Sequence, residues 1–274
     1  MSPQVGAVSA GGAPVDPRPP LAGRGAVVTG GGRGIGAAVA QALADAGAAV
    51  VAAARSEDEI ERVATELRGR GAIAWAIPCD VADEGSVRRL AAEAGRRLVS
   101  VDILVNNAGA SSSSPFQRIT LAEWSRVLAV NATGTFLCTR ELVGGMAERR
   151  WGRIVNIASV AGLAGARYVA HYAAAKHAVV GFTRSIALEL AGTGVTANAV
   201  CPAYVDTPMT EGALAHVQSR AGLSRDQALA AVLATTGQAR LVAPEEVAAA
   251  VLRLCEGGSD VTGQTIVLGT ESGA

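Results

Sequence analysis

The stretch AVVTGGGRGIG, residues 26–36, joins a short apolar run to a glycine-rich turn, and an amphipathic segment follows at once. An apolar run, a glycine turn and a helix in this order are typical of the first strand, loop and helix of a doubly wound parallel sheet. In such a sheet the turn lies at the carboxyl end of the strand, where backbone N–H groups and the positive end of the helix can bind a pyrophosphate. The stretch therefore predicts a nucleotide-binding α/β fold.

The alternation that begins at residue 26 continues along the chain. Strand-like apolar runs, each bounded by Gly, Asp, Asn or Pro, occupy residues 26–29, 48–54, 73–78, 103–106, 153–159, 195–200 and 265–268. Helix-length segments, with apolar residues three and four positions apart, occupy residues 35–46, 57–68, 86–98, 121–149, 172–191 and 244–256. We therefore predict a doubly wound, seven-stranded parallel sheet of Rossmann-like type, covered by helices on both faces.

Two segments depart from this alternation. Residues 1–22 are rich in Gly, Pro, Ala and Ser and have no apolar period, which predicts a flexible tail before a single domain over residues 23–274. An insertion at about residues 207–241 has helical Ala/Leu periodicity and no strand. We interpret this insertion as a small helical lid over a ligand; a helical decoration that only supports an oligomer contact is the alternative.

Composition excludes several classes of protein. The chain has 274 residues, of which 50% are hydrophobic and 18% charged, and its 24 basic side chains balance 24 acidic ones. A neutral chain without a dense basic run is not expected to bind nucleic acid or a membrane surface. No basic region followed by an apolar block opens the chain, so a cytoplasmic protein is expected. The four cysteines lie far apart and predict buried thiols and no metal site.

The residue after the second strand bears on the choice of cofactor. Sites that prefer NAD usually have an acidic residue there, which binds the ribose hydroxyls, whereas arginine suits a 2′-phosphate. This chain has Ala54 followed by Arg55, and Arg33 in the glycine turn can add a second positive charge. NADP(H) is therefore favoured. If Arg55 is only a solvated surface residue, NAD(H) remains possible.

A second motif carries groups for proton transfer. Ser159 follows the fifth strand, and Tyr172 and Lys176 stand four positions apart in a predicted helix, so they share a face. A nearby ammonium favours the phenolate and is expected to lower the pKa of Tyr172, which would make the phenol a usable acid or base. Ser159, at the carboxyl end of its strand, can hydrogen-bond a substrate oxygen.

With these motifs in this order, the chain resembles the short-chain dehydrogenase/reductase family from about residue 21 to residue 268. The matching motifs are residues 29–36, Asp80-Val81, residues 106–109, Asn131, Ser159, Tyr172 with Lys176, and residues 202–207. Two departures are Ala203, where the family usually has glycine after Pro202, and the ending at residues 269–274. They affect details of the cofactor pocket and of subunit contact, not the proton-transfer residues.

The resemblance implies a role for each catalytic residue. Tyr172 would be the general acid in reduction and the base in oxidation, and Ser159 would orient the carbonyl. Lys176 would bind the nicotinamide ribose and lower the pKa of Tyr172, and Asn131 would hold a water connecting Lys176 to solvent. The expected cofactor-binding residues are Gly30, Arg33, Gly34, Ile35, Gly36, Arg55, Asp80, Val81, Asn107, Ala108, Gly109, Tyr172, Lys176, Pro202, Val205 and Thr207.

Asn107 and two histidines beside the Tyr172 and Lys176 pair also have a purely structural interpretation. The alternative for Asn107 is a brace for the central sheet. His171 and His177, on either side of the Tyr172 and Lys176 pair, are interpreted as packing or surface residues rather than acids.

Residues 171–209 are most similar to the family's reductases of β-ketoacyl thioesters and polyketides, and also resemble 3-hydroxybutyrate and hydroxyacyl-CoA dehydrogenases. We expect an NADPH-dependent oxidoreductase that reduces a ketone, such as a 3-oxoacyl thioester or a polyketide-type carbonyl, to an alcohol. The alternative is an NAD-dependent alcohol, 3-hydroxyacid or 3-hydroxyacyl-CoA dehydrogenase. A binding protein without turnover is disfavoured because all four catalytic residues are present. The resemblance also implies a homo-oligomer, a tetramer or dimer, formed by residues 121–149 and 172–191.

Overall fold

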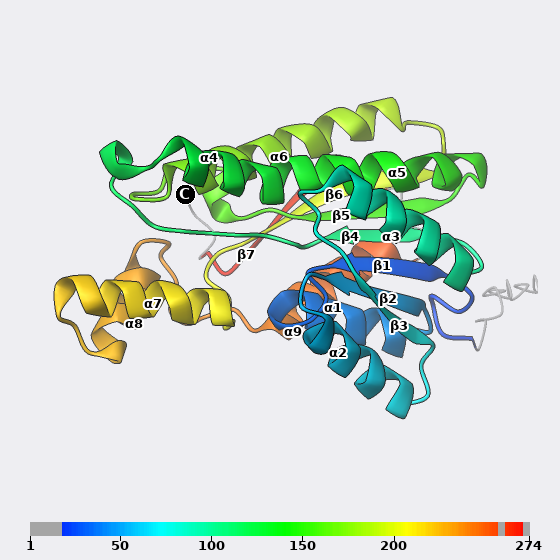
Figure 1. Cartoon of the computed structure of the whole chain (residues 1–274), viewed down its shortest axis with the longest axis horizontal. Coiled ribbons are helices and arrows are strands. Elements are labelled where there is room, and N and C mark those ends of the chain that lie inside the picture. The colour runs from blue at the N-terminus through cyan, green and yellow to red at the C-terminus, as the bar shows by residue number, and fades with distance from the viewer. Residues whose placement is uncertain (1–17, 257–260, 271–274) are drawn as a thin grey trace, which may run out of the picture.

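The sheet is built around β1 (Gly25–Thr29), which is buried along its whole length. In the computed structural model, which describes residues 18–256 and 261–270, the strands form one seven-stranded parallel sheet in the order β3-β2-β1-β4-β5-β6-β7 (Figure 1). The other strands are β2 (Ala49–Ala54), β3 (Ala74–Pro78), β4 (Ile103–Asn106), β5 (Gly152–Ile157), β6 (Val195–Pro202) and β7 (Thr265–Leu268). The predicted doubly wound parallel sheet is confirmed.

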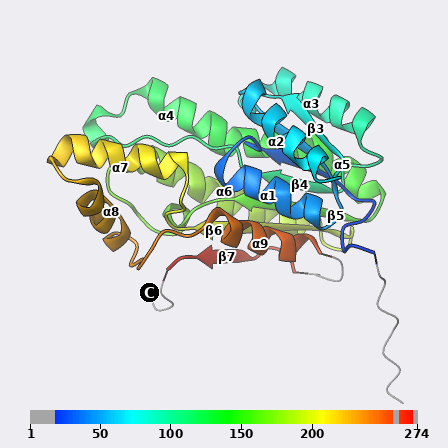
Figure 2. The same ribbon diagram turned by 90° about the horizontal axis from the view of Figure 1, so that it is seen from below.

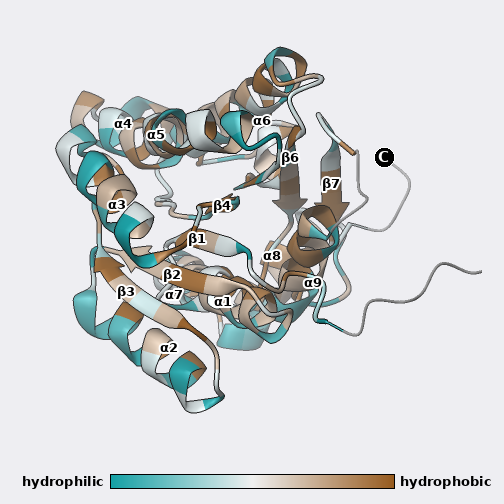
Figure 3. Cartoon of the chain, turned by 90° about the vertical axis from the view of Figure 1, so that its right-hand side faces the viewer, coloured by the Kyte–Doolittle hydropathy of each residue, from teal (hydrophilic) through white to brown (hydrophobic). Residues whose placement is uncertain are grey.

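Helices cover both faces of this sheet (Figure 1). One face carries α1 (Gly34–Asp45), α2 (Glu57–Gly69) and α9 (Pro244–Cys255); the other carries α3 (Glu84–Arg97), α5 (Gly134–Glu148) and α6 (Ala170–Glu189), with α4 (Leu121–Leu128) beside α6. Val28 belongs to the apolar cluster of the first face and Val27 to that of the second, because successive side chains of a strand point to opposite sides. Figure 3 accordingly shows mostly brown strands between helices that carry teal segments.

The parallel arrangement brings the carboxyl ends of the strands to one edge of the sheet. The chain winds outward from β1 in two directions, through β2 to β3 and from β4 to β7. The loops after β1 and β4 therefore diverge at the switch point between these two strands, which is where a doubly wound sheet binds its ligand. This edge is the place where the residues predicted for cofactor binding and catalysis can meet.

The predicted lid is helical, as expected, and lies at one end of the molecule (Figures 1 and 2). It consists of α7 (Pro208–Ala221) and α8 (Arg225–Ala234), which share a small apolar cluster around Leu214 and Val232. The base of the lid is closed by a bridge between Val205 and Val242. Gln238 strengthens this base because its side-chain amide pairs with the backbone N–H and C=O of Tyr204, at 2.8 and 3.1 Å.

Most predicted element boundaries lie within two residues of those observed, and the two larger differences concern Leu21 and residues 121–149. Leu21, placed in the N-terminal tail, is fully buried, and its N–H donates to Ala46 O, so the packed structure begins before residue 23. The remainder of the predicted tail, residues 1–17, lies outside the described residues. The single helix predicted over residues 121–149 is divided into α4 and α5 by a π-helical turn at Ala129–Thr133, which contains Asn131.

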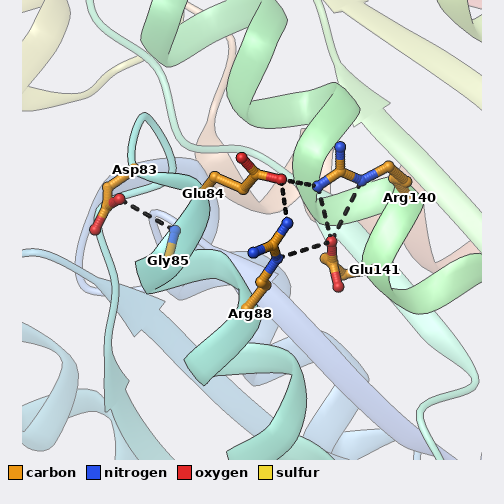
Figure 4. Close-up of polar contacts among 6 residues, drawn as sticks. All are labelled: Asp83, Glu84, Gly85, Arg88, Arg140 and Glu141. Atoms are coloured by element: carbon orange, nitrogen blue, oxygen red, sulfur yellow. Dashed lines mark hydrogen bonds and ion pairs between the residues drawn. The ribbon is translucent and has the colours of Figure 1, made fainter.

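An ionic cluster joins α3 to α5 on the outside of the sheet (Figure 4). Glu84 accepts hydrogen bonds from Arg88 and Arg140, at 2.6 Å each, and Arg140 also donates to Glu141. The side chain of Asp83 caps α3 by accepting from the N–H groups of Gly85 and Ser86. Because the paired side chains are solvent-exposed, we expect the cluster to orient α3 and α5 more than to stabilise the fold.

Within residues 18–256 and 261–270, no helix is long and apolar enough to cross a bilayer. The same residues contain no group of three His, Cys, Asp or Glu side chains that could hold a metal ion.

Candidate active site

The glycine turn after β1 has the backbone conformation that its glycines permit. Gly30 and Gly34 have φ angles of 63° and 52°, a region that other residues rarely adopt. A Cβ atom on Gly36 would lie 2.1 Å from the carbonyl oxygen of Gly30, so α1 starts in direct contact with the turn. The N-cap residue Arg33 forms no side-chain cap hydrogen bond, which leaves the first N–H groups of α1 for an anion. The turn fits a pyrophosphate.

Asn107 holds this turn from the neighbouring strand β4. Its Nδ2 donates to the carbonyl oxygens of Thr29 and Gly30, at 3.0 and 3.1 Å. In return, Thr29 Oγ1 accepts from the backbone N–H groups of Asn107 and Ala108. These contacts support the bracing interpretation of Asn107, since both hydrogens of its amide point at the turn.

The two arginines expected near a 2′-phosphate differ in their surroundings. Arg33 Nη1 lies 3.2 Å from Glu59 Oε1 on α2, and both side chains are partly or largely exposed. Arg55 directly follows β2 and is exposed. Both arginines therefore stand at the carboxyl edge of the sheet, on the β2 side of the glycine turn.

Asp80 and Val81 follow β3 at the same edge. Asp80 Oδ1 accepts from the N–H of Ala82, and its own N–H donates to Ser86 Oγ. Val81 is buried against Gly134, where an added Cβ would lie 2.7 Å from Val81 Cγ2. Both residues therefore stand at the carboxyl edge of the sheet, and their contact with an adenine stays a prediction.

Asn131 lies in the π-helical turn between α4 and α5, a deformation that is common at functional sites. Its Nδ2 donates to the carbonyl oxygens of Ala110 and Val127, both at 2.8 Å. Its Oδ1 is buried and has no hydrogen-bond partner among the described residues. A buried acceptor in this state is a place for a water or a ligand donor, which agrees with the expected water site.

Ser159, Tyr172 and Lys176 converge beside β5. Ser159 N-caps a short 3-10 helix, Val160–Gly162, and its hydroxyl hydrogen-bonds the phenol of Tyr172. Lys176 is 4% exposed, and its Nζ donates to Ile157 O at 2.7 Å. The same Nζ lies 5.6 Å from the centroid of the Tyr172 ring. A Cβ on Gly109 would lie 3.0 Å from Asn131 Oδ1 and 3.8 Å from Lys176 Nζ, so the Asn131 amide adjoins this group.

The remaining predicted residues connect the sheet to the lid. Pro202 ends β6, Val205 is buried, and Thr207 precedes α7. A Cβ on Gly34 would lie 3.1 Å from Thr207 Cγ2, so the start of the lid touches the glycine turn. Ala203 has no positive φ, since the described non-glycine residues with one are Arg150 and Tyr168. Alanine is therefore accommodated after Pro202 without strain.

The chain is similar in sequence to known proteins. Residues 24–218 match the family model described as short chain dehydrogenase. The chain belongs to the short-chain dehydrogenase/reductase family.

Relatives in this family include reductases and dehydrogenases. The 3-oxoacyl-[acyl-carrier-protein] reductase FabG of Aquifex aeolicus is 38% identical, covering 90% of this chain and 96% of the relative. The D-beta-hydroxybutyrate dehydrogenase of Rhizobium meliloti is 35% identical, covering 87% and 94%. A crystal structure of a variant of actinorhodin polyketide ketoreductase with NADPH superimposes with a TM-score of 0.86, at 39% identity, covering 89% of this chain and 95% of that one.

Burial dominates the electrostatics of this short-chain dehydrogenase/reductase site. It raises the pKa of Tyr172 to about 12, an effect that the hydrogen bond with Ser159 opposes and that Tyr204 and Cys201 reinforce. Burial also lowers the pKa of Lys176 to about 8. Lys176 is not among the groups that shift the pKa of Tyr172 here, so the lowering expected from its ammonium stays a prediction.

Two neighbours of the catalytic tyrosine were missed from sequence. Cys201 is fully buried on β6, and Tyr204 follows at the base of the lid; both act on the pKa of Tyr172. Both residues lie within residues 200–207, in or beside the motif that was expected to contact the nicotinamide end of the cofactor. This position is the sequence signal that could have identified them. Of the two histidines, His177 is exposed and His171 is fully buried.

Proposed function

We propose that this member of the family is an NADPH-dependent reductase that converts a ketone to an alcohol, with Tyr172 as the general acid. The observation that carries the proposal is the meeting of Ser159, Tyr172 and Lys176 beside β5, where Lys176 Nζ lies 5.6 Å from the centroid of the Tyr172 ring and donates to Ile157 O. The phenol of Tyr172, whose pKa is raised to about 12, holds its proton at neutral pH and can give it to a carbonyl oxygen in reduction. Oxidation would use the same group as the base.

Each catalytic residue has one task in this proposal. NADPH, when bound, supplies the hydride to the carbonyl carbon. Ser159 and Tyr172 hydrogen-bond the carbonyl oxygen, and Tyr172 transfers its phenolic proton to that oxygen as negative charge develops. Lys176 binds the nicotinamide ribose and, while charged, favours the phenolate left behind. Asn131 holds, through its free Oδ1, a water that returns protons from solvent.

The remaining residues hold the cofactor. The turn at Gly30, Gly34, Ile35 and Gly36 binds the pyrophosphate, and Arg33 and Arg55 bind the 2′-phosphate. The rest of the proposed pocket consists of Asp80 and Val81 at the adenine, Asn107, Ala108 and Gly109 along the adenosine ribose, and Pro202, Val205 and Thr207 at the nicotinamide. NADPH in the actinorhodin ketoreductase structure supports NADP(H) over NAD(H).

The substrate proposed is a 3-oxoacyl thioester or a polyketide-type carbonyl. The names of the FabG relative and of the actinorhodin ketoreductase support this class. The similarity to D-beta-hydroxybutyrate dehydrogenase favours the alternative, an NAD-dependent dehydrogenase of a 3-hydroxyacid. In both cases residues 207–241 act as a lid of the same domain, over the substrate.

We also propose a cytoplasmic homo-oligomer. Four free, buried cysteines suit a reducing compartment. Phe136 on α5 is 43% exposed and packs edge-on against Phe182 on α6, and Leu188 on α6 is 80% exposed. Apolar side chains on the outer sides of these two helices suit contact with a second copy in a dimer or tetramer.

The proposed function is tested by titrating the purified protein with NADPH and NADH by fluorescence, and then measuring turnover on β-keto thioesters and cyclic ketones. Tighter NADPH binding together with thioester turnover supports the proposal. Preference for NADH with oxidation of 3-hydroxyacids would establish the alternative instead.

Replacing Arg55 by alanine is expected to weaken NADPH binding about 10- to 100-fold and to leave NADH binding unchanged, because only NADPH carries the 2′-phosphate that the guanidinium binds. Dissociation constants from the same fluorescence titration measure the effect. Arg70→Ala, which removes an exposed arginine at the end of α2, is the control. Equal losses of affinity for NADPH and NADH would show that Arg55 does not bind the 2′-phosphate.

Lys176 is the only lysine of the chain, so its titration can be followed directly. Protein labelled with ¹³C-lysine should give one Cε signal with a midpoint near the pKa of about 8, and kcat/KM for reduction should fall above that pH. At pH values between about 8 and 10.5, the ordinary pKa of lysine, Lys176 is protonated in the unfolded chain but has lost its proton in the folded chain. Stability from this group therefore rises with pH in that window. A midpoint near 10.5 and a flat rate profile would contradict the expectation.

A further inference from the structure

The segment that follows β4 leads directly away from the catalytic residues. Gly109 adjoins Asn131 and Lys176, and the next carbonyl, that of Ala110, accepts from Asn131 Nδ2 at 2.8 Å. Residues 110–115 then lead from Ala110 toward α4 (Figure 1). Where this segment lies therefore affects the space beside Tyr172.

The loop before α6, which leads into Tyr172, is joined to the segment by a backbone hydrogen bond. The N–H of Ser114 donates to Tyr168 O at 2.8 Å. Tyr168 has a φ of 65°, which is costly for a bulky side chain and persists only where its surroundings hold it. The two loops therefore support each other's conformation.

A second link comes from His171, the residue before the catalytic tyrosine. Its imidazole is 0% exposed, and Nε2 lies 2.7 Å from Ser112 Oγ in a hydrogen bond and 3.7 Å from Glu123 Oε1 on α4. Its Nδ1 is buried and has no hydrogen-bond partner within the part of the chain that the structure describes. Moving Ser112 away would leave Nε2 of this buried ring without its hydrogen bond, which is costly, so the segment is held against α6.

We propose that His171 is a positioning residue that fixes residues 110–115 against α6 and thereby determines how the ketone fits beside Tyr172. The inference rests on the proposed reductase function for its kinetic consequence. The hydrogen bond of the His171 side chain goes to Ser112 and not to Ser159, Tyr172 or Lys176, so His171 acts through Ser112. The interaction should contribute to binding of the ketone and little to the transfer of the proton or to binding of NADPH.

His171→Leu tests this inference by kinetics. We expect KM for the ketone to rise about tenfold, the effect of losing one hydrogen bond that orders the segment, while kcat changes less than about threefold and the Kd of NADPH stays the same. His171→Gln should restore most of the KM, because its side-chain amide can reach Ser112. His177→Leu, an exposed histidine on the same helix, is the control. Equal KM values for the Leu variant and the wild type would overturn the inference.

A double-mutant cycle with Ser112 separates the link from general damage to the fold. Ser112→Ala should raise KM as His171→Leu does, with little further effect when the two are combined, whereas Ser113→Ala should have none. Additive effects of the two substitutions would refute the link. If His171→Leu fails to fold, the comparison of Ser112→Ala with Ser113→Ala decides alone.

Amide hydrogen exchange provides a readout that does not need turnover. Ser112→Ala should accelerate exchange in the peptide containing residues 110–116 and leave β4 unchanged. If no ketone is reduced by the wild type but this acceleration is seen, the proposed function fails and the link stands. Unchanged exchange in an active enzyme would overturn the link and leave the function intact.

Discussion

Tyr172→Phe is expected to lower kcat for ketone reduction by about 10²- to 10⁴-fold, because the substitution removes the proton that the general acid donates and little else. The ring stays in place, so the packing against Lys176 Nζ, 5.6 Å from its centroid, is preserved. The Kd of NADPH should therefore remain close to that of the wild type. Steady-state turnover and fluorescence titration on the same preparation measure both quantities.

Tyr168→Phe is the matched control for this substitution, since Tyr168 lies in the loop before α6 and its side chain is exposed. It should retain nearly full activity. A Tyr172→Phe enzyme that keeps more than a tenth of the wild-type rate would show that another group supplies the proton. Lost turnover with intact cofactor binding would exclude a binding protein without catalysis.

Gly36→Ala is expected to weaken binding of both NADPH and NADH about 100-fold or more. The added Cβ would lie 2.1 Å from the carbonyl oxygen of Gly30 and 2.5 Å from Asn107 Nδ2, and the first of these is backbone. The turn must open to make room, which displaces the N–H groups that face the pyrophosphate and destabilises the fold by about 1–3 kcal/mol. Cofactor titration and thermal unfolding measure the two effects.

Gly95→Ala provides the comparison, because the Cβ at this position on α3 would meet nothing within 4 Å. In an exposed helix this exchange should raise stability by up to about 1 kcal/mol through helix propensity, with no change in cofactor binding. If Gly36→Ala binds NADPH as tightly as Gly95→Ala does, the close approach at the turn is not required for the cofactor.

The fold could be predicted from the sequence because its signals are local. Strand and helix periods are local properties, and the boundaries predicted for β4 and β7 agree with the structure, at residues 103–106 and 265–268. The glycine turn also carries its own signal, since glycine is the residue type that fits φ angles like those of Gly30 and Gly34. Family membership followed from the order of such motifs.

Contacts between distant parts of the chain could not be predicted in this way. The interaction of Ser112 with His171 spans 59 positions, and nothing in the local pattern around either residue indicates it. The division of residues 121–149 at Asn131 is also a tertiary effect, because the segment has an unbroken helical period while Asn131 must reach Ala110 across the site. Leu21 was misplaced because one apolar residue after prolines has no period.

The amino-acid sequence by itself determined the doubly wound fold, the family and the residue types available for proton transfer, because these depend on local periodicity and on motif order. The tertiary structure alone decided the state of those residues. Burial raises the pKa of Tyr172 to about 12 and lowers that of Lys176 to about 8, effects that their spacing of four along the helix does not contain. The physical reason is that spacing along a helix specifies which side chains are neighbours, whereas the cost of a charge depends on the atoms that exclude water around it.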